Sequence, residues 1–297
     1  MNNINERLEI KDASALQFLN SDFEVTELCN DCTFSEGPLW HPDGFLLFSD
    51  IPRNTIYKVD IEGKKEIFLE QSGWNGSGSE NLSHMTGSNA LAWDKNGDLL
   101  ICQHGNHGLA VLDRKKKMNS LVSTYDGKPF NSPNDLVVNS RGEVYFTDPP
   151  YGLKDEKLVP GKFQPVAGVY YLNSNKTELI LSDLQFPNGI CFSPDEKYLY
   201  VCSNKKHEPF LMRFYFGGGK IVKDKLCEAN SDGLKCDIYG NLYLANESGV
   251  LMYSPEGRHL ARIKLNHIPS NLNWGPDRKT LFITAREAIY MIRDLIK

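Results

Sequence analysis

The chain has 297 residues, of which 40% are hydrophobic and 24% charged, with a formal net charge of −5. This composition is typical of a globular protein with a large core, and it excludes an intrinsically disordered chain. The acidic balance, with Arg114–Lys117 as the longest basic run, argues against nucleic acid as a partner. The polar start MNNINERLEI, and the lack of a stretch near the ~20 apolar residues of a membrane span, predict a cytoplasmic protein without a membrane partner.

Seven cysteines lie between Cys29 and Cys236, too thinly spread for the disulfide framework of a small secreted domain. We therefore expect them to be reduced. Cys29 and Cys32 form a C-x-x-C motif, which in zinc or redox proteins is accompanied by a second pair or by a βαβ unit. Neither accompanies it here, so two small apolar side chains in a strand are the favoured interpretation.

A hairpin pattern is repeated along the chain. Each copy has a polar first residue, a short alternating strand, a turn with Gly, Pro, Asp or Asn, and a second strand rich in Leu, Tyr, Phe and Val. The copies begin at Glu36, Asn89, Asn134, Asn188, Asp232 and Asn271. Their spacing of 39 to 54 residues brackets the ~40–50 residues of a four-stranded propeller blade. The sequence thus predicts an all-β fold, a six-bladed β-propeller with four-stranded blades.

The remaining segments predict how the ring is completed. We expect residues 23–297 to form a single propeller domain, preceded by an N-terminal extension at residues 1–22. The segment Phe23–Cys29 is expected to supply an outer strand that closes the ring against the last blade, at Leu281–Ile292. Two long inserts between repeats, Gln71–Gly87 and Tyr151–Gly168, are predicted to be surface loops that form a rim or lid over one face.

The first residue of each repeat is the candidate for chemistry. In a propeller the innermost strands line a central channel, so these six residues should face one axial space. All six bear oxygen, with carboxylates at Glu36 and Asp232, and none is His or Cys. Such a set suits a hard cation such as Ca²⁺, Mg²⁺ or Mn²⁺ better than structural zinc. For any single position an ordinary turn residue is an equal alternative, but the aligned set favours a polar binding site.

These segments resemble the senescence marker protein/gluconolactonase family, also called regucalcin-like, of six-bladed propeller lactonases. NSPND followed by TDPPYG is typical of its gluconolactonase-like branch. The resemblance extends from about Phe23 to the C-terminus through SEGPLW (35–40), SDIP (49–52), CQHG (102–105), NSPNDLVV (131–138), FTDPPYGL (146–153), FPNG (186–189), SDGL (231–234) and LFITA (281–285).

The resemblance implies one divalent cation held by Glu36, Asn188 and Asp232 at the mouth of the channel. Ca²⁺ is the first expectation, with Mg²⁺, Mn²⁺ or Zn²⁺ as alternatives. Asn134 matches a residue that contacts the substrate or, in related phosphotriesterase propellers, the metal. Animal members carry an Arg two residues earlier, where this chain has Ser132, so their substrate range does not carry over.

The implied reaction is metal-dependent hydrolysis of a sugar lactone, such as glucono-1,5-lactone, to the aldonic acid. The cation would polarise the carbonyl group, and Asp232 would act as general base or solely as a ligand. Asn134, Asn89, Gln103 and His104 are expected to bind the substrate. A phosphotriester or aryl-ester hydrolase using the same ion, and a non-catalytic Ca²⁺-binding propeller, are the alternatives. We expect a small lactone as the partner, and a monomer or weak homodimer.

Overall fold

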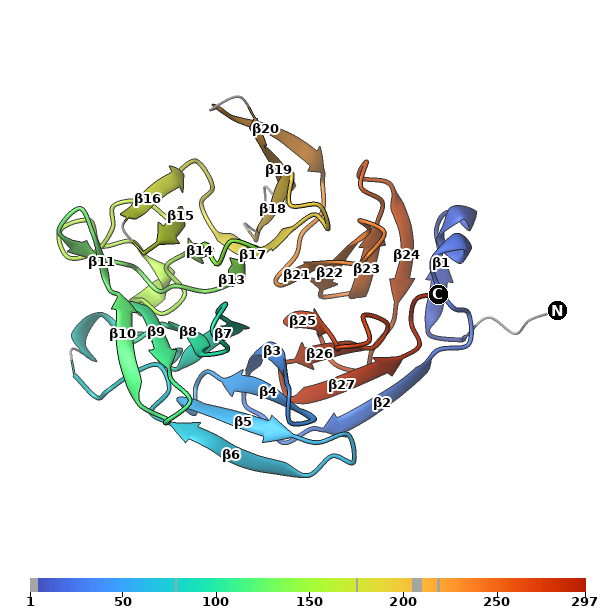
Figure 1. The fold of residues 1–297 in the computed structure, drawn as a ribbon, viewed down its shortest axis with the longest axis horizontal. Coiled ribbons are helices and arrows are strands. Elements are labelled where there is room, and N and C mark those ends of the chain that lie inside the picture. The colour runs from blue at the N-terminus through green and yellow to red at the C-terminus, as the bar shows by residue number, and fades with distance from the viewer. Residues whose placement is uncertain (1–4, 78, 175, 205–209, 218–219) are drawn as a thin grey trace.

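The structure is a computed structural model that describes residues 5–77, 79–174, 176–204, 210–217 and 220–297. Its strands form six antiparallel sheets arranged as blades around a central channel (Figure 1). The predicted six-bladed β-propeller is therefore confirmed. No helix among the described residues is long and apolar enough to cross a membrane.

Each blade is a meander in which consecutive strands pair, from the channel outwards. Blade one consists of β3 (Ser35–His41), β4 (Phe45–Asp50), β5 (Thr55–Val59) and β6 (Lys65–Glu70). Blade two consists of β7 (Ser88–Trp93), β8 (Leu99–Gln103), β9 (Gly108–Leu112) and β10 (Met118–Val122). Blade three consists of β13 (Leu136–Val138), β14 (Val144–Asp148), β15 (Gly168–Asn173) and β16 (Lys176–Leu181). A separate two-stranded sheet, β11 (Thr124–Tyr125) and β12 (Lys128–Pro129), lies between blades two and three in the sequence.

Blades four to six follow the same order. They consist of β17 (Pro187–Phe192), β18 (Tyr198–Ser203), β19 (Phe210–Gly217) and β20 (Lys220–Cys227); β21 (Leu234–Cys236), β22 (Leu242–Asn246), β23 (Gly249–Tyr253) and β24 (His259–Ile263); and β25 (Asn271–Trp274), β26 (Leu281–Ala285) and β27 (Ala288–Arg293) with β2 (Glu24–Cys29) outside them. Blade six therefore combines the two ends of the chain.

The ring closes through β2, as the sequence predicted. This strand pairs antiparallel with β27, with Glu24 opposite Arg293 and Cys29 opposite Ile289. The innermost strands touch their neighbours around the whole circle, and β25 of the last blade contacts β3 of the first. A continuous inner wall therefore surrounds the channel.

The described part of the N-terminal extension packs on the ring. Strand β1 (Leu8–Ile10) pairs with β24 as a fifth strand of blade five. The 3₁₀ helix η1 (Ala13–Gln17) follows, with Asp12 as its N-cap accepting a 2.9 Å hydrogen bond from the Ser14 amide. Leu19 is fully buried in the cluster between blades five and six.

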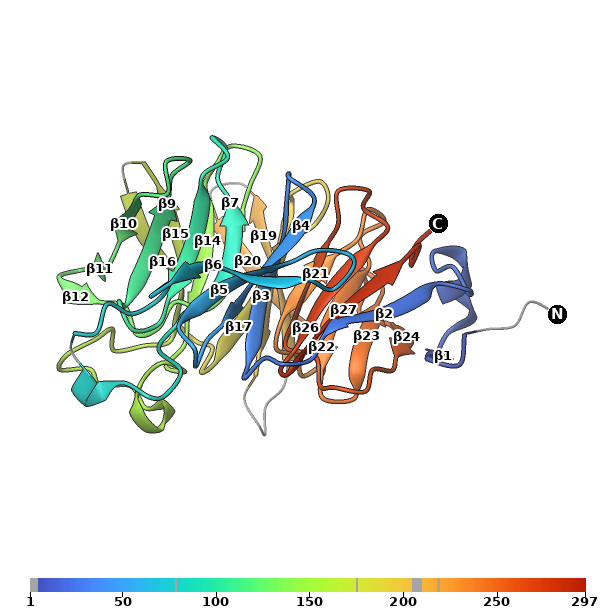
Figure 2. The ribbon, with the colours of Figure 1, turned by 90° about the horizontal axis from the view of Figure 1, so that it is seen from below.

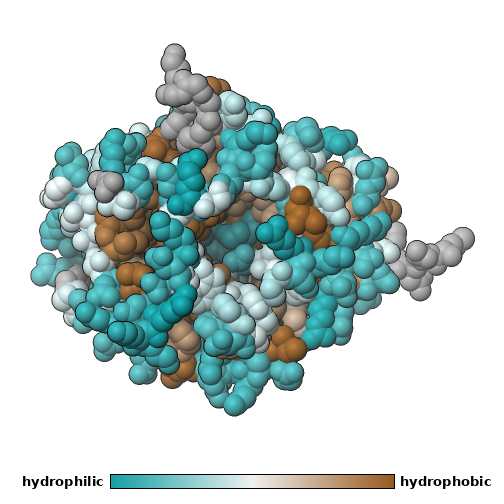
Figure 3. Space-filling model, in the orientation of Figure 1, coloured by the Kyte–Doolittle hydropathy of each residue, from teal (hydrophilic) through white to brown (hydrophobic). Residues whose placement is uncertain are grey.

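The apolar core is divided among the seams between blades. Six clusters of buried side chains each join two neighbouring blades. Leu47 of blade one packs with Ile101 of blade two, and Phe48 packs with Phe282 of blade six. Burial at the seams leaves the axis free for polar residues, and Figure 3 shows a central hollow with hydrophilic residues at its bottom.

The two long inserts meet on one face of the ring. The first contains η2 (Ser79–Asn81) and the second contains η3 (Lys154–Glu156), and both project from the lower side in Figure 2. Leu82 forms a β-bridge with Leu153, and the Ser83 amide donates a 3.0 Å hydrogen bond to the Gly152 carbonyl. They therefore form a joined rim, as the sequence predicted.

Candidate active site

A cavity of about 260 Å³ lies at the end of the channel bordered by the two inserts. Five of the six first residues of the repeats line it, and two residues from each of the inserts complete its wall. The lining residues that carry oxygen or nitrogen donors are Glu36, His84, Asn89, His104, Asn134, Tyr151, Glu156, Asn188, Asn204 and Asp232. The structure therefore brings together Glu36, Asn89, His104, Asn134, Asn188 and Asp232.

Glycines behind these side chains bring the inner strands close together. A Cβ added at Gly189 would lie 2.5 Å from the Leu234 nitrogen on the next blade, and one added at Gly37 would lie 2.5 Å from the Asn89 carbonyl oxygen. The Gly189 amide uses this proximity to donate a 2.9 Å hydrogen bond to the Asp232 carbonyl. Gly189 is thus required by the close approach of the backbones of two neighbouring blades. The Asn188-Gly189 dipeptide lies inside β17 and does not form a hairpin turn.

Asp232 is half-buried among polar partners and lines the cavity. Its Oδ1 accepts a 2.8 Å hydrogen bond from Nδ2 of the Asn188 side chain. The same Nδ2 also lies 3.2 Å from the Tyr151 hydroxyl. Burial raises the pKa of Asp232 to about 7, against the hydrogen bond from Asn188 and the positive charge of Arg286, which both lower it. This carboxyl group can therefore exchange a proton near neutral pH.

Glu36 is the second carboxylate of the site. Its Oε2 accepts hydrogen bonds of 2.9 Å from the Gly37 amide and from Asn271 Nδ2. Burial, and then the negative charge of Asp232, raise the pKa of Glu36 well above its usual value. Asn271, the sixth first residue, does not line the cavity, and it holds Glu36 in place from behind.

Asn89 and His104 act as a pair. His104 Nδ1 lies 2.9 Å from the Met85 carbonyl oxygen, which can only accept, so Nδ1 carries the proton. Its Nε2 then accepts a 3.2 Å hydrogen bond from Nδ2 of the Asn89 side chain. Burial lowers the pKa of His104 to about 4, so the ring is neutral at physiological pH. Asn89 Oδ1 is buried with no hydrogen-bond partner among the described atoms, which leaves an acceptor for a ligand.

Asn134 is fixed by its backbone. Its amide donates a 2.8 Å hydrogen bond to the Thr147 carbonyl, and its carbonyl accepts one of 3.0 Å from the Ala90 amide of blade two. The side chain lines the cavity between those of Asn89 and Asn188 in blade order. This position suits contact with either the substrate or a cation.

Gln103 is placed differently from the sequence expectation. Its amide donates a 2.7 Å hydrogen bond to the Ser72 carbonyl, and it lines a separate surface depression together with Asn106. Gln103 is the last residue of β8 and His104 lies in the turn that follows, and of the two only His104 lines the channel cavity. We therefore leave Gln103 out of the candidate site.

Ser132 occupies the position of the animal Arg and anchors the second insert. The hydroxyl is buried, donates to the Pro149 carbonyl at 2.5 Å and accepts a 2.9 Å hydrogen bond from the Gly152 amide. These bonds hold the backbone on both sides of Tyr151. Asp148 supports the same turn, because its Oδ1 accepts a 2.8 Å hydrogen bond from the Ser132 amide.

Several lining residues were not singled out from the sequence. His84 and Met85 come from the first insert, and Tyr151 and Glu156 come from the second. Because the inserts lie outside the repeat register, the pattern predicted a rim but not which side chains it directs inwards. The motif TDPPYG, which runs into the second insert and contains Tyr151, was the available signal for this residue.

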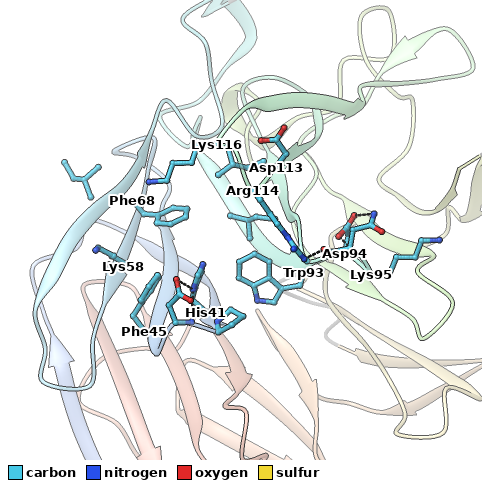
Figure 4. Close-up of a pocket in the computed structure, with 17 residues that line it drawn as sticks. His41, Phe45, Lys58, Phe68, Trp93, Asp94, Lys95, Asp113, Arg114 and Lys116 are labelled. Atoms are coloured by element: carbon cyan, nitrogen blue, oxygen red, sulfur yellow. Dashed lines mark hydrogen bonds and ion pairs between the residues drawn. The ribbon is translucent and has the colours of Figure 1, made fainter.

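A larger groove of about 970 Å³ separates blades one and two (Figure 4). Aromatic side chains, including Phe45 and Trp93, line it together with lysines. Its acidic residues are used locally, because Asp94 Oδ1 accepts hydrogen bonds from the amides of Asn96 and Asp98. The groove lacks the carboxylate and carboxamide set of the channel cavity, and we do not assign the site to it.

Known proteins share this architecture and much of the sequence. The family model for the SMP-30/Gluconolactonase/LRE-like region matches residues 34–287. A gluconolactonase of Zymomonas mobilis is 32% identical over 287 residues, covering 91% of this chain and 81% of the relative.

Two solved structures have the same fold as this chain. A gluconolactonase of Xanthomonas campestris superimposes with a TM-score of 0.84 at 26% identity, covering 98% of this chain and 95% of its own. The calcium-binding regucalcin of Agrobacterium tumefaciens has a TM-score of 0.74 at 19% identity, over 93% and 95% of the two chains, and shares the fold. The chain belongs to the SMP-30/gluconolactonase/LRE-like family of six-bladed propellers.

Proposed function

We propose that this protein hydrolyses a sugar lactone of the glucono-1,5-lactone class to the aldonic acid, with one divalent cation in the channel cavity. The observation that carries this proposal is the pair of carboxylates, the buried Glu36 and the half-buried Asp232, in one cavity with the carboxamides of Asn89, Asn134 and Asn188. The gluconolactonases of Zymomonas mobilis and Xanthomonas campestris support it as relatives.

The donor set fits a hard cation. The carboxylates of Glu36 and Asp232 repel each other, and a divalent cation between them would offset both charges. Asn188 would add a carboxamide oxygen, and the carboxamide of Asn134 is a further oxygen donor. Because these donors are oxygens, Ca²⁺ is our first choice, with Mg²⁺, Mn²⁺ or Zn²⁺ as alternatives.

When bound, the cation supplies Lewis-acid polarisation of the lactone carbonyl and stabilises the charge that develops on its oxygen. Asp232 acts as the general base, at the Oδ2 atom that the hydrogen bond from Asn188 leaves open. It takes a proton from the attacking water and then returns it to the ring oxygen as the ester bond breaks.

The other residues bind and orient the sugar. Asn134 and the free Oδ1 of Asn89 face the sugar hydroxyls, and the neutral His104 holds Asn89 in that orientation. The joined inserts, with Tyr151 facing Asn188, cover one side of the cavity and limit the access of bulk water.

The test is one assay with three substrates. Purified protein is stripped with a chelator, and Ca²⁺, Mg²⁺, Mn²⁺ and Zn²⁺ are added back singly. Hydrolysis of glucono-1,5-lactone, an aryl phosphotriester and an aryl acetate is then followed by proton release. We expect the lactone to be the best substrate and its hydrolysis to depend on added cation. Full activity in chelator would refute the requirement for a cation. Preference for the phosphotriester or the aryl acetate would refute the lactonase assignment. Cation binding without turnover would favour a binding protein.

A further inference from the structure

A pair of cysteines lies outside the channel, at the seam that closes the ring. Cys29 ends β2, and Cys32 lies in the loop that leads to β3. The two sulfur atoms and a carboxylate oxygen of Asp31 all lie within 4.8 Å of one another. Backbone hydrogen bonds hold this loop, since the Cys32 amide donates to the Glu287 carbonyl at 3.0 Å and the Thr33 amide to Asp50 Oδ2 at 2.8 Å. The two thiols are thus kept adjacent by the fold.

The two thiols differ in environment. Cys29 is half-buried, whereas Cys32 is buried behind it, with 7% of its surface exposed. A hydrogen bond from the Cys32 thiol, and then the ammonium group of Lys65, lower the pKa of Cys29. The same hydrogen bond, together with burial, raises the pKa of Cys32. Such a pair has a more exposed thiol suited to attack and a protonated thiol behind it suited to resolve the product.

Lys65 is the cation beside the pair, and it favours a Cys29 thiolate against the opposing charges of Asp31 and Glu27. Lys65 forms an ion pair with Asp31, and its Nζ lies 4.8 Å from the centre of the Tyr57 ring. Its side chain is only 13% exposed, so its charge acts at close range with little screening. Because Asp31 is already neutralised by Lys65, only two sulfur ligands remain free, fewer than a closed structural zinc site requires.

We propose that Cys29 and Cys32 form a redox-active dithiol that low-molecular-weight disulfides oxidise to an intramolecular disulfide. The Cys29 thiolate attacks one sulfur of the disulfide RSSR, forming a mixed disulfide and releasing RS⁻. Cys32 gives its proton to the released thiolate and attacks Cys29 Sγ, which expels the second RS⁻. Counted from the dithiol, the protein loses two electrons and two protons, and RSSR becomes two RSH. This inference does not depend on the lactonase proposal.

Peptide mass measurement of the full chain tests the proposal. Reduced protein is equilibrated with glutathione and glutathione disulfide at graded ratios, quenched with acid, alkylated with N-ethylmaleimide and digested with trypsin. The tryptic peptide 12–53 contains Cys29 and Cys32 and no other cysteine. We expect this peptide to lose the mass of two hydrogen atoms and to escape alkylation as the oxidised fraction increases.

Variants separate the two roles. Cys32→Ser should trap one glutathionyl group on Cys29. Cys29→Ser should leave the peptide free of glutathione. Lys65→Gln should slow alkylation of Cys29 several-fold at neutral pH. Cys227→Ser, at another half-buried cysteine, is the matched control and should behave as wild type.

Three results would overturn the proposal, and none of them needs a substitution. The first is the absence of a Cys29–Cys32 disulfide in the wild-type chain at every glutathione ratio. The second is alkylation of Cys29 no faster than that of Cys227. The third is stoichiometric zinc in the purified protein that thiol alkylation releases, because the pair would then be a metal site.

Discussion

The carboxamide of Asn188 and the carboxylate of Asp232 come from neighbouring blades and share a 2.8 Å hydrogen bond at the bottom of the channel cavity. The bond occupies Oδ1 of Asp232 and stabilises its charged form, while burial opposes ionisation and raises the pKa to about 7. The balance of these two effects sets the pH at which Asp232 can accept a proton.

Removing the Asn188 amide should therefore change the pH dependence of the reaction. In Asn188→Ala the pKa of Asp232 rises, so the acid limb of the kcat profile should move to higher pH. The variant also loses an oxygen donor, and we expect a loss of at least tenfold in cation affinity. The profile is measured at saturating Ca²⁺, with Asn119→Ala on the exposed strand β10 as the control. An unshifted acid limb would show that Asp232 does not control it.

The stability of the cation-free protein should fall as pH rises. The pKa values of Glu36 and Asp232 are raised, and burial raises that of Asp148 to about 8. Between the ordinary and raised values the folded chain binds protons that the unfolded chain has released, so stability decreases with pH. His104, whose pKa is lowered to about 4, titrates on the acid side and does not contribute above pH 6.5.

Thermal unfolding in chelator measures this effect. We expect Tm at pH 8.5 to be lower than at pH 6.5 by about 5 °C or more. Added Ca²⁺ should reverse most of the loss, because it binds the ionised carboxylates. A Glu36→Gln/Asp232→Asn double variant is the control and should show a smaller pH difference. A Tm that rises with pH in wild type would contradict the raised pKa values.

Ser132 should matter for substrate binding through the second insert. Ser132→Ala removes the hydrogen bonds to Pro149 and Gly152 and leaves buried backbone groups unpaired, at a cost of about 1–3 kcal/mol. Because these bonds hold Tyr151, we expect KM for the lactone to rise several-fold with a smaller change in kcat. Steady-state kinetics checks this, with the exposed Ser120→Ala as the control. An unchanged KM would separate the insert from substrate binding.

The repeat register explains why much of the site could be predicted. One polar residue recurs at or just before the start of each inner strand, and ring symmetry brings these positions together, so the sequence alone could predict that Glu36, Asn134 and Asp232 line one cavity. Gln103 was grouped with His104 because the two are adjacent in the sequence, but Gln103 ends β8 with its side chain bonded to the Ser72 carbonyl, whereas His104 lies in the following turn and lines the cavity.

Contacts that depend on ring closure or on the inserts were beyond the sequence pattern. Asn271 reaches Glu36 because the last blade lies beside the first, a contact across 235 positions. Tyr151 and His84 lie in inserts with no counterpart in the other repeats, so no register indicated their direction. The described part of the N-terminal extension is held by the pairing of β1 with β24. This pairing adds a fifth strand to a blade that the repeat pattern already predicted to be complete with four.

Asp232 is the general base of the proposed reaction, and two matched substitutions isolate that role. Asp232→Asn and Glu36→Gln each keep an oxygen donor and remove one negative charge, but only the first removes the proposed proton acceptor. The measurement is kcat for glucono-1,5-lactone across a Ca²⁺ titration. We predict that Glu36→Gln recovers most of its rate at high Ca²⁺, whereas Asp232→Asn stays about 10²–10⁴-fold below wild type even at saturation. Recovery of Asp232→Asn to within a few-fold of wild type would contradict the account and leave Asp232 as a ligand alone.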